Sequence, residues 1–128
     1  MTPKPGADEW LKYAEDDLKV IEILLQGKRF RGCCFHAQQA AEKALKGFLI
    51  HSGKPYPKIH NLVRLNNLCT NINSEFYSLT AKIIIISQLF MPTQYPDVPV
   101  GDGPSQRIAY EVFDYARDIV NFCSEKIR

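Results

Sequence analysis

The sequence predicts an all-α fold, a helical bundle of four long helices and one short helix. Apolar residues recur at spacings of three and four in each long segment, the period of a helix that packs on one side. Glycine and proline are unevenly distributed, and most of them stand between these segments. The one β-branched run, Ile83–Ile86, has no second strand candidate to pair with, so we predict that it is helical as well.

The size and composition of the chain fit one domain over residues 1–128. The sequence is 45% apolar and 23% charged, which is ordinary for a soluble globular protein and excludes a disordered tail or a fibrous repeat. Sixteen Lys and Arg against fourteen Asp and Glu give a net charge of +2. Proteins that bind long nucleic acids by counterion release usually carry a denser basic excess. This charge leaves room for a small phosphate ligand or a local RNA contact.

The four cysteines and the N-terminal segment predict a cytoplasmic protein with reduced thiols. The cysteines contain no Cys-x-x-Cys pair that would begin a zinc site, so we expect no metal. Residues 1–6 are polar, hold two prolines and show no secretory signal, and we expect them to be flexible. The longest aliphatic run, Ile83–Ile86, is far shorter than the ~20 apolar residues of a membrane span.

The first two helices are predicted on either side of Gly27. Residues 7–26 carry a clear apolar stripe, with Asp8 as a candidate N-cap and Gly27 as a candidate C′ residue. The second helix is predicted from about Arg29 to Ser52. Its apolar side is rich in alanine and cysteine, so a neighbouring helix can approach it closely.

The rest of the chain alternates between turns and helices. A turn at residues 53–57 precedes a short helix over about 60–70. Ser74 is the expected cap of a helix that reaches about Phe90, with inward-facing Phe76, Leu79, Ile83, Ile86 and Phe90. Four prolines and two glycines predict a long irregular loop over 91–104, and such loops are often functional. The last helix is predicted from Ser105 to about Lys126.

Polar residues of the second helix form a stripe away from its small apolar side. His36, Gln39, Lys43 and Lys46 follow one another at spacings of three, four and three, so they stack on successive turns. One interpretation is a surface that binds an anion or a nucleotide. The other is a solvated helix face with extended lysines.

Two further segments are candidates for ligand contact. Tyr95 precedes a proline, which favours an extended backbone and a ring that projects for stacking on a base. A Tyr-Pro turn packed on the end of the bundle is the alternative. His60 fits either a capping residue or a polar group at a site shared with the second helix.

Phe35 predicts contact with a second subunit. It lies on the outer side of the second helix beside Gly32 and Gln39, where a monomer gains nothing from a large apolar group. We therefore expect a homodimer with Phe35 and Gly32 in its interface.

The stretch Cys34–Lys46, CFHAQQAAEKALK, resembles the central motif of the HEPN (higher eukaryotes and prokaryotes nucleotide-binding) domain family. Three weaker features agree in order: Asp17-Leu18 resembles an acidic-leucine pair, Ile59–Leu62 a His-Asp-Leu segment, and Tyr95-Pro96-Asp97 an Arg-Tyr-Pro-Asp loop. The match spans roughly residues 8–125. Gln94 and Asn61 stand where the family has arginine and aspartate, and the loss of the arginine weakens the expectation of anion binding at the loop.

The resemblance implies an up-and-down helical bundle, usually dimeric and often encoded beside a minimal nucleotidyltransferase. Members are implicated in nucleotide binding, and some are toxins that cleave RNA. The leading hypothesis is thus a nucleotide-binding or partner-binding module of a toxin–antitoxin-like pair, with ATP or GTP as the ligand class and no other cofactor. Its expected ligand residues are His36, Gln39, Lys43, Lys46, His60, Gln94, Tyr95 and Asp97.

Two alternatives remain open. One is metal-independent RNA cleavage by Arg29 or Arg31 with His36, although the family's late Arg-x4-6-His motif is absent because no histidine follows His60. On a continuous helix Arg31 points ~140° away from His36, whereas Arg29 aligns with it. The other alternative is a purely structural helical partner subunit without a small ligand.

Overall fold

The computed structural model describes residues 5–55, 57–94 and 104–128, with the side chains of 91–94 left out. Within these ranges the chain forms five α-helices and one 3-10 helix and contains no strand. The helices are α1 (Ala7–Gln26), α2 (Phe30–His51), α3 (Leu62–Ile72), α4 (Thr80–Gln94) and α5 (Gln106–Ile127), and the 3-10 helix η1 (Ser74–Leu79) leads into α4. The predicted all-α bundle is confirmed.

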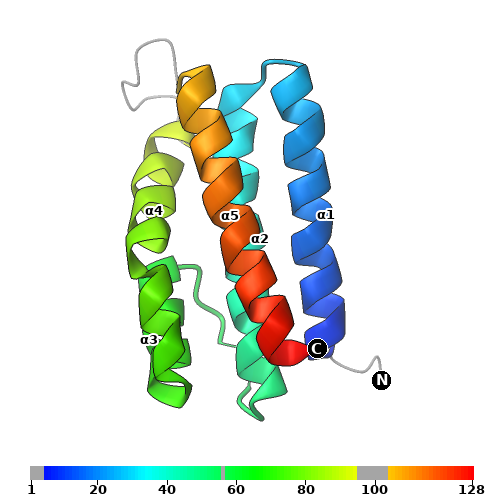
Figure 1. The fold of residues 1–128 in the computed structure, drawn as a ribbon, viewed down its shortest axis with the longest axis vertical. Coiled ribbons are helices and arrows are strands. Elements are labelled where there is room, and N and C mark those ends of the chain that lie inside the picture. Colours follow the sequence, from blue (N-terminus) through cyan, green and yellow to red (C-terminus); the bar gives the residue numbers. More distant parts are fainter. Residues whose placement is uncertain (1–4, 56, 95–103) are drawn as a thin grey trace.

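The long helices alternate in direction, so the bundle is of the up-and-down type (Figure 1). The short α3 runs beside the lower half of α2, and η1 turns the chain back upward into α4. α2 packs against α1, α3, α4 and α5, which makes it the central helix. Its alanines at positions 37, 40, 41 and 44 are fully buried and allow this close packing.

The helix starts differ from the predicted caps at three places. Gly6, not Asp8, is the N-cap of α1, and Glu9 accepts a hydrogen bond from the Gly6 backbone nitrogen. Asn61 caps α3, which therefore begins after His60. Asn73 rather than Ser74 caps η1, because its side chain accepts from the Glu75 backbone nitrogen. Each helix begins one or two residues from the expected position. At α3 and η1 the reason is an asparagine side chain that accepts from a free N–H group of the first turn, whereas Gly6 makes no such bond.

Two loop predictions also change. Gly27 is the C-cap of α1 with φ −85°, and the left-handed residue of the turn is Lys28, with φ 57°. α4 continues to Gln94 instead of ending at Phe90. The Ile83–Ile86 run is helical, and the predicted Ser105 cap of α5 is confirmed by a bond from the Ile108 backbone nitrogen.

All four cysteines are free and buried. Burial raises the pKa of Cys33 and Cys34 to about 11 and that of Cys69 to about 12. The thiols therefore stay protonated at neutral pH and act as small apolar side chains. None of the helices described is long and apolar enough to cross a membrane.

Candidate functional site

Asp17 of α1 is a buried carboxylate that joins two residues of the predicted polar stripe. Its side chain is only 8% exposed. His36 Nδ1 lies 2.9 Å from Oδ1, and Lys43 Nζ donates to Oδ2 at 2.7 Å. Both partners come from α2, so the group ties the two helices together and neutralises the Lys43 charge.

Glu42 of α2 is the centre of a second, similar group. Its Oε2 accepts from Lys46 Nζ at 3.0 Å and from His60 Nδ1 at 2.9 Å. Its Oε1 is buried and has no hydrogen-bond partner among the residues described. Glu42 thereby holds His60, whose side chain is 82% exposed, at the protein surface.

One of the two interpretations of the polar stripe, a solvated helix face, does not hold at Lys46, and the other three positions are only partly exposed. Lys46 is 3% exposed, and its ammonium lies 5.8 Å from the centre of the Trp10 ring. Gln39, Lys43 and His36 are half-buried. The reason is the central place of α2, which has neighbours on most of its sides, so a helical projection with one buried side does not describe it. Asp17 and Glu42 neutralise the cations that the sequence pattern left unpaired.

The other predicted residues of α2 lie near the upper end of the bundle. Arg29 is the N-cap of α2, and Arg31 is exposed in its first turn. Phe35 is 38% exposed, and its ring centre lies 5.8 Å from that of Phe90 on α4. Gly32 faces α1, where an added Cβ would lie 3.0 Å from Leu24 Cδ1.

A pocket of about 330 Å³ opens beside His60, between α2, α3 and α4. Its lining comprises Gln38, His60, Asn61, Leu62, Val63, Arg64, Ser87 and Phe90. The buried Gln38 donates to the His60 carbonyl oxygen at 3.1 Å and so fixes the backbone that enters α3. The first turn of α3 lines this pocket, and the N-terminal end of a helix favours an anion. The Ser87 hydroxyl is buried and has no hydrogen-bond partner within the described ranges.

Sequence reasoning missed Arg64, Phe90 and Ser87 as site residues. Arg64 follows the Asn61 cap by three residues, so it falls in the first turn of α3, and recognising that cap would have placed it beside His60. No local signal links Phe90 or Ser87 to His60. Tyr95 and Asp97, and the side chain of Gln94, lie outside the described residues. In the part of the chain that the structure describes, no group of three His, Cys, Asp or Glu side chains is arranged to hold a metal ion.

A family model described as the HEPN domain matches residues 7–127. The chain belongs to the HEPN domain family. This match confirms the family resemblance of the Cys34–Lys46 motif and extends it to nearly the whole sequence. The fold agrees as well, since two solved structures share it at TM-scores near 0.8.

The solved structures are ST0689, an archaeal HEPN homologue, and TT1696 from Thermus thermophilus. ST0689 is 28% identical, with a TM-score of 0.78 over 98% of this chain and 100% of its own. TT1696 is 29% identical, with a TM-score of 0.80 over 94% of this chain and 97% of its own. A curated relative from Methanocaldococcus jannaschii, named "Putative toxin MJ1304", is 25% identical over 99 residues. That match covers 73% of this chain and 65% of the relative.

Proposed function

We propose that this HEPN domain is a nucleotide-binding or partner-binding module of a toxin–antitoxin-like pair. In this proposal it acts as a homodimer with a minimal nucleotidyltransferase as its partner. Membership of the HEPN family and similarity to a protein named as a toxin support the proposal.

The pocket beside His60 is the ligand site that the geometry supports best. The observation that carries this assignment is the convergence of Arg64, His60, the first turn of α3 and the Phe90 ring on one pocket. Arginine binds phosphate oxygens through its fork of N–H donors, and an aromatic ring stacks on a base. A nucleotide offers both groups at once. In this proposal Lys43 binds the Asp17 carboxylate and Lys46 binds the Glu42 carboxylate, and neither lysine contacts the ligand. Lys46 thereby helps Glu42 to hold His60.

Calorimetric titration with ATP and with GTP tests the ligand. We expect saturable binding by the intact chain and at least a tenfold weaker affinity in Arg64→Gln, because a bidentate phosphate contact is lost. Arg117→Gln is the matched control, since Arg117 is also an exposed helical arginine but lies on α5, outside this pocket. No heat with folded protein at millimolar nucleotide contradicts the ligand part of the proposal.

Copurification of the chain with proteins of its own host tests the partner. We expect a nucleotidyltransferase in the purified complex. Copurification together with the absence of nucleotide binding would favour a purely structural subunit instead.

The His36–Asp17 pair favours one second candidate, metal-independent RNA cleavage with Arg29 or Arg31. A carboxylate on Nδ1 orients the imidazole and leaves Nε2 as the nitrogen that exchanges a proton. An RNA degradation assay decides between the candidates. If the chain is a nuclease, His36→Ala loses activity, and so does at least one of Arg29→Ala and Arg31→Ala. Equal inertness of the native chain and His36→Ala excludes this candidate.

A further inference from the structure

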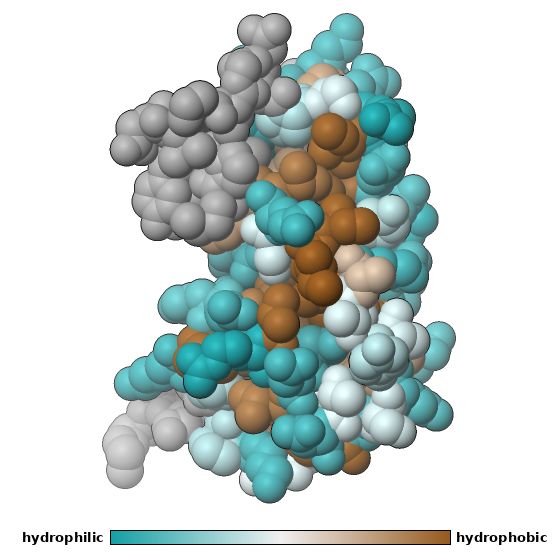
Figure 2. All heavy atoms as spheres, turned by 90° about the vertical axis from the view of Figure 1, so that its left-hand side faces the viewer, coloured by the Kyte–Doolittle hydropathy of each residue, from teal (hydrophilic) through white to brown (hydrophobic). Residues whose placement is uncertain are grey.

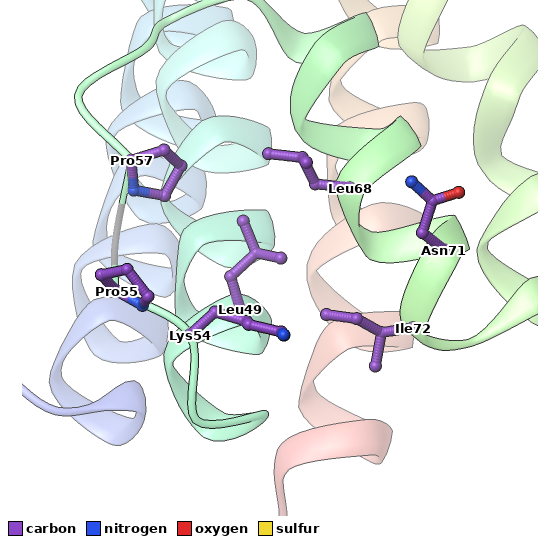
Figure 3. A pocket seen from close by; sticks show the side chains of 7 residues that line it. All are labelled: Leu49, Lys54, Pro55, Pro57, Leu68, Asn71 and Ile72. Carbon is purple, nitrogen blue, oxygen red and sulfur yellow. The ribbon is translucent and has the colours of Figure 1, made fainter.

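A second pocket, of about 440 Å³, lies at the opposite end of α3 from the site beside His60. Its walls are Leu49 at the end of α2, Pro55 and Pro57 in the turn that follows, and Leu68 and Ile72 on α3. Two polar residues, Lys54 and Asn71, complete the lining. Figure 3 shows the apolar side chains of Leu49, Leu68 and Ile72 turned toward one another, with the Lys54 ammonium directed toward Ile72. A mostly apolar pocket with a few polar groups is the usual form of a small-molecule site.

The segment of the chain that contains all the lining residues carries charge of one sign. Residues 43–74 contain five Lys and Arg and no Asp or Glu. Lys43 and Lys46 bind carboxylates of earlier residues. Lys54, Lys58 and Arg64 form no ion pair with any residue that the structure describes. Lys54 is thus a cation without a carboxylate partner in the described structure, placed in an apolar pocket.

We propose that this pocket binds a small amphipathic monocarboxylate. The apolar part of the ligand packs on Leu49, Leu68 and Ile72, and its carboxylate accepts hydrogen bonds from the Lys54 ammonium. A single cation with one neighbouring amide matches one negative charge, whereas a phosphate group needs more donors. The volume lies in the range of small-molecule pockets, which favours a free ligand over a protein segment.

Backbone ¹H–¹⁵N NMR titration of the full chain with octanoate tests this site. We expect saturable shifts at the amides of Leu49, Lys54, Leu68 and Ile72. Heptan-1-ol has the same seven-carbon apolar chain without the charge, so we expect octanoate to bind about three- to fivefold more tightly, as for a solvent-accessible ion pair. Equal affinity for the two compounds, or shifts that do not saturate or lie elsewhere, would overturn the proposal.

Two charge variants distinguish the effect of Lys54, which lines the pocket, from that of the nearby Lys58. Lys54→Met keeps the apolar stem, and we expect it to lower the octanoate affinity to that of heptan-1-ol. Lys58→Met removes an exposed charge outside the lining, and we expect it to change neither affinity by more than twofold. Leu68 is 41% exposed, so we expect Leu68→Gln to keep the fold and to weaken the binding of both compounds. If an acidic peptide binds this pocket and octanoate does not, the occupant is a protein partner and the proposal is refuted.

Discussion

Asp17 on α1 and Glu42 on α2 are the centres of two similar groups of side chains. Each carboxylate is almost fully buried and holds one lysine and one histidine. Burying a charge is costly unless it is paired, so each carboxylate keeps its lysine in a defined position. The histidines gain a fixed orientation from the same contacts, which is the property that a binding or catalytic site requires.

Removal of the Asp17 carboxylate tests this interpretation. We expect Asp17→Ala to lower the free energy of unfolding by about 3 kcal/mol, because the partly buried Lys43 loses its partner. Asp16→Ala is the matched control, since Asp16 is exposed and forms no ion pair within the described part of the chain. Urea denaturation followed by circular dichroism measures both. A loss of equal size in the two variants would show that the pair contributes little.

The buried thiols make stability depend on pH above about 8.5. An unfolded thiol has a pKa near 8.5, whereas burial holds Cys34 at about 11 in the folded state. The unfolded chain therefore releases protons that the folded chain keeps, and the free energy of unfolding falls as the pH rises from about 8.5 toward 11. Below that range the thiols contribute no pH dependence.

The Cys34→Ala variant isolates one thiol in this range. Urea denaturation between pH 8 and 10 is expected to give a shallower fall than in the native chain, by up to about 1.4 kcal/mol per pH unit at the upper end. Parallel curves for the two proteins would mean that Cys34 ionises as readily in the folded as in the unfolded state.

Two glycines of α2 govern how closely this helix meets its neighbours. At Gly47 an added Cβ would lie 3.3 Å from the Ala7 carbonyl oxygen and 3.3 Å from Trp10 Cβ. Both atoms belong to the first turn of α1, one to the backbone and the other to a Cβ attached directly to it. At Gly32 the nearest atom, at 3.0 Å, is the end of the Leu24 side chain, which can rotate away.

Alanine at the two positions is therefore expected to have opposite effects. Gly47→Ala is predicted to lower the melting temperature, because overpacking against backbone costs about 1–3 kcal/mol and exceeds the helix-propensity gain of about 1 kcal/mol. Gly32→Ala is predicted to leave the melting temperature unchanged or to raise it. Thermal denaturation of both variants checks this, and a stabilised Gly47→Ala would show that α1 shifts at little cost.

At the scale of the whole molecule, contacts join the two ends of the described chain. Arg128 binds Asp8 and Glu15 of α1, and the Arg128 guanidinium, followed by Lys12, lowers the pKa of Asp8.

The opposite surface, where α3 and α4 lie, carries a band of apolar side chains (Figure 2). Exposed apolar residues of these helices include Val63, Leu68 and Ile84. Contiguous apolar surface of this kind favours association with another protein.

Light scattering tests the proposed homodimer. We expect a mass of two chains for the native protein and one chain for Phe35→Asp, because the charge opposes burial of this surface. Ile23→Asp, at a more exposed position on α1, is the matched control and is expected to remain dimeric. A native mass of one chain would refute the homodimer.

The helices and the family could be predicted from the sequence because both depend on nearby residues. The 3.6-residue period and the position of the breakers located α1, α2 and α5 to within one or two residues. Cap positions were less accurate, because Gly6, Asn61 and Asn73 compete with equally suitable neighbours. The Cys34–Lys46 motif identified the family, which the match over residues 7–127 confirms.

By itself, then, the sequence determined an all-α bundle of the HEPN family and placed His36, Lys43, Lys46 and His60 among its polar residues. Only the tertiary structure decided what these residues do. The partners of Lys43 and His60 lie 26 and 18 residues away in the chain, and helical periodicity carries no information about such contacts. The same holds for Arg64 and Phe90, which meet at one pocket because α3 and α4 pack on α2.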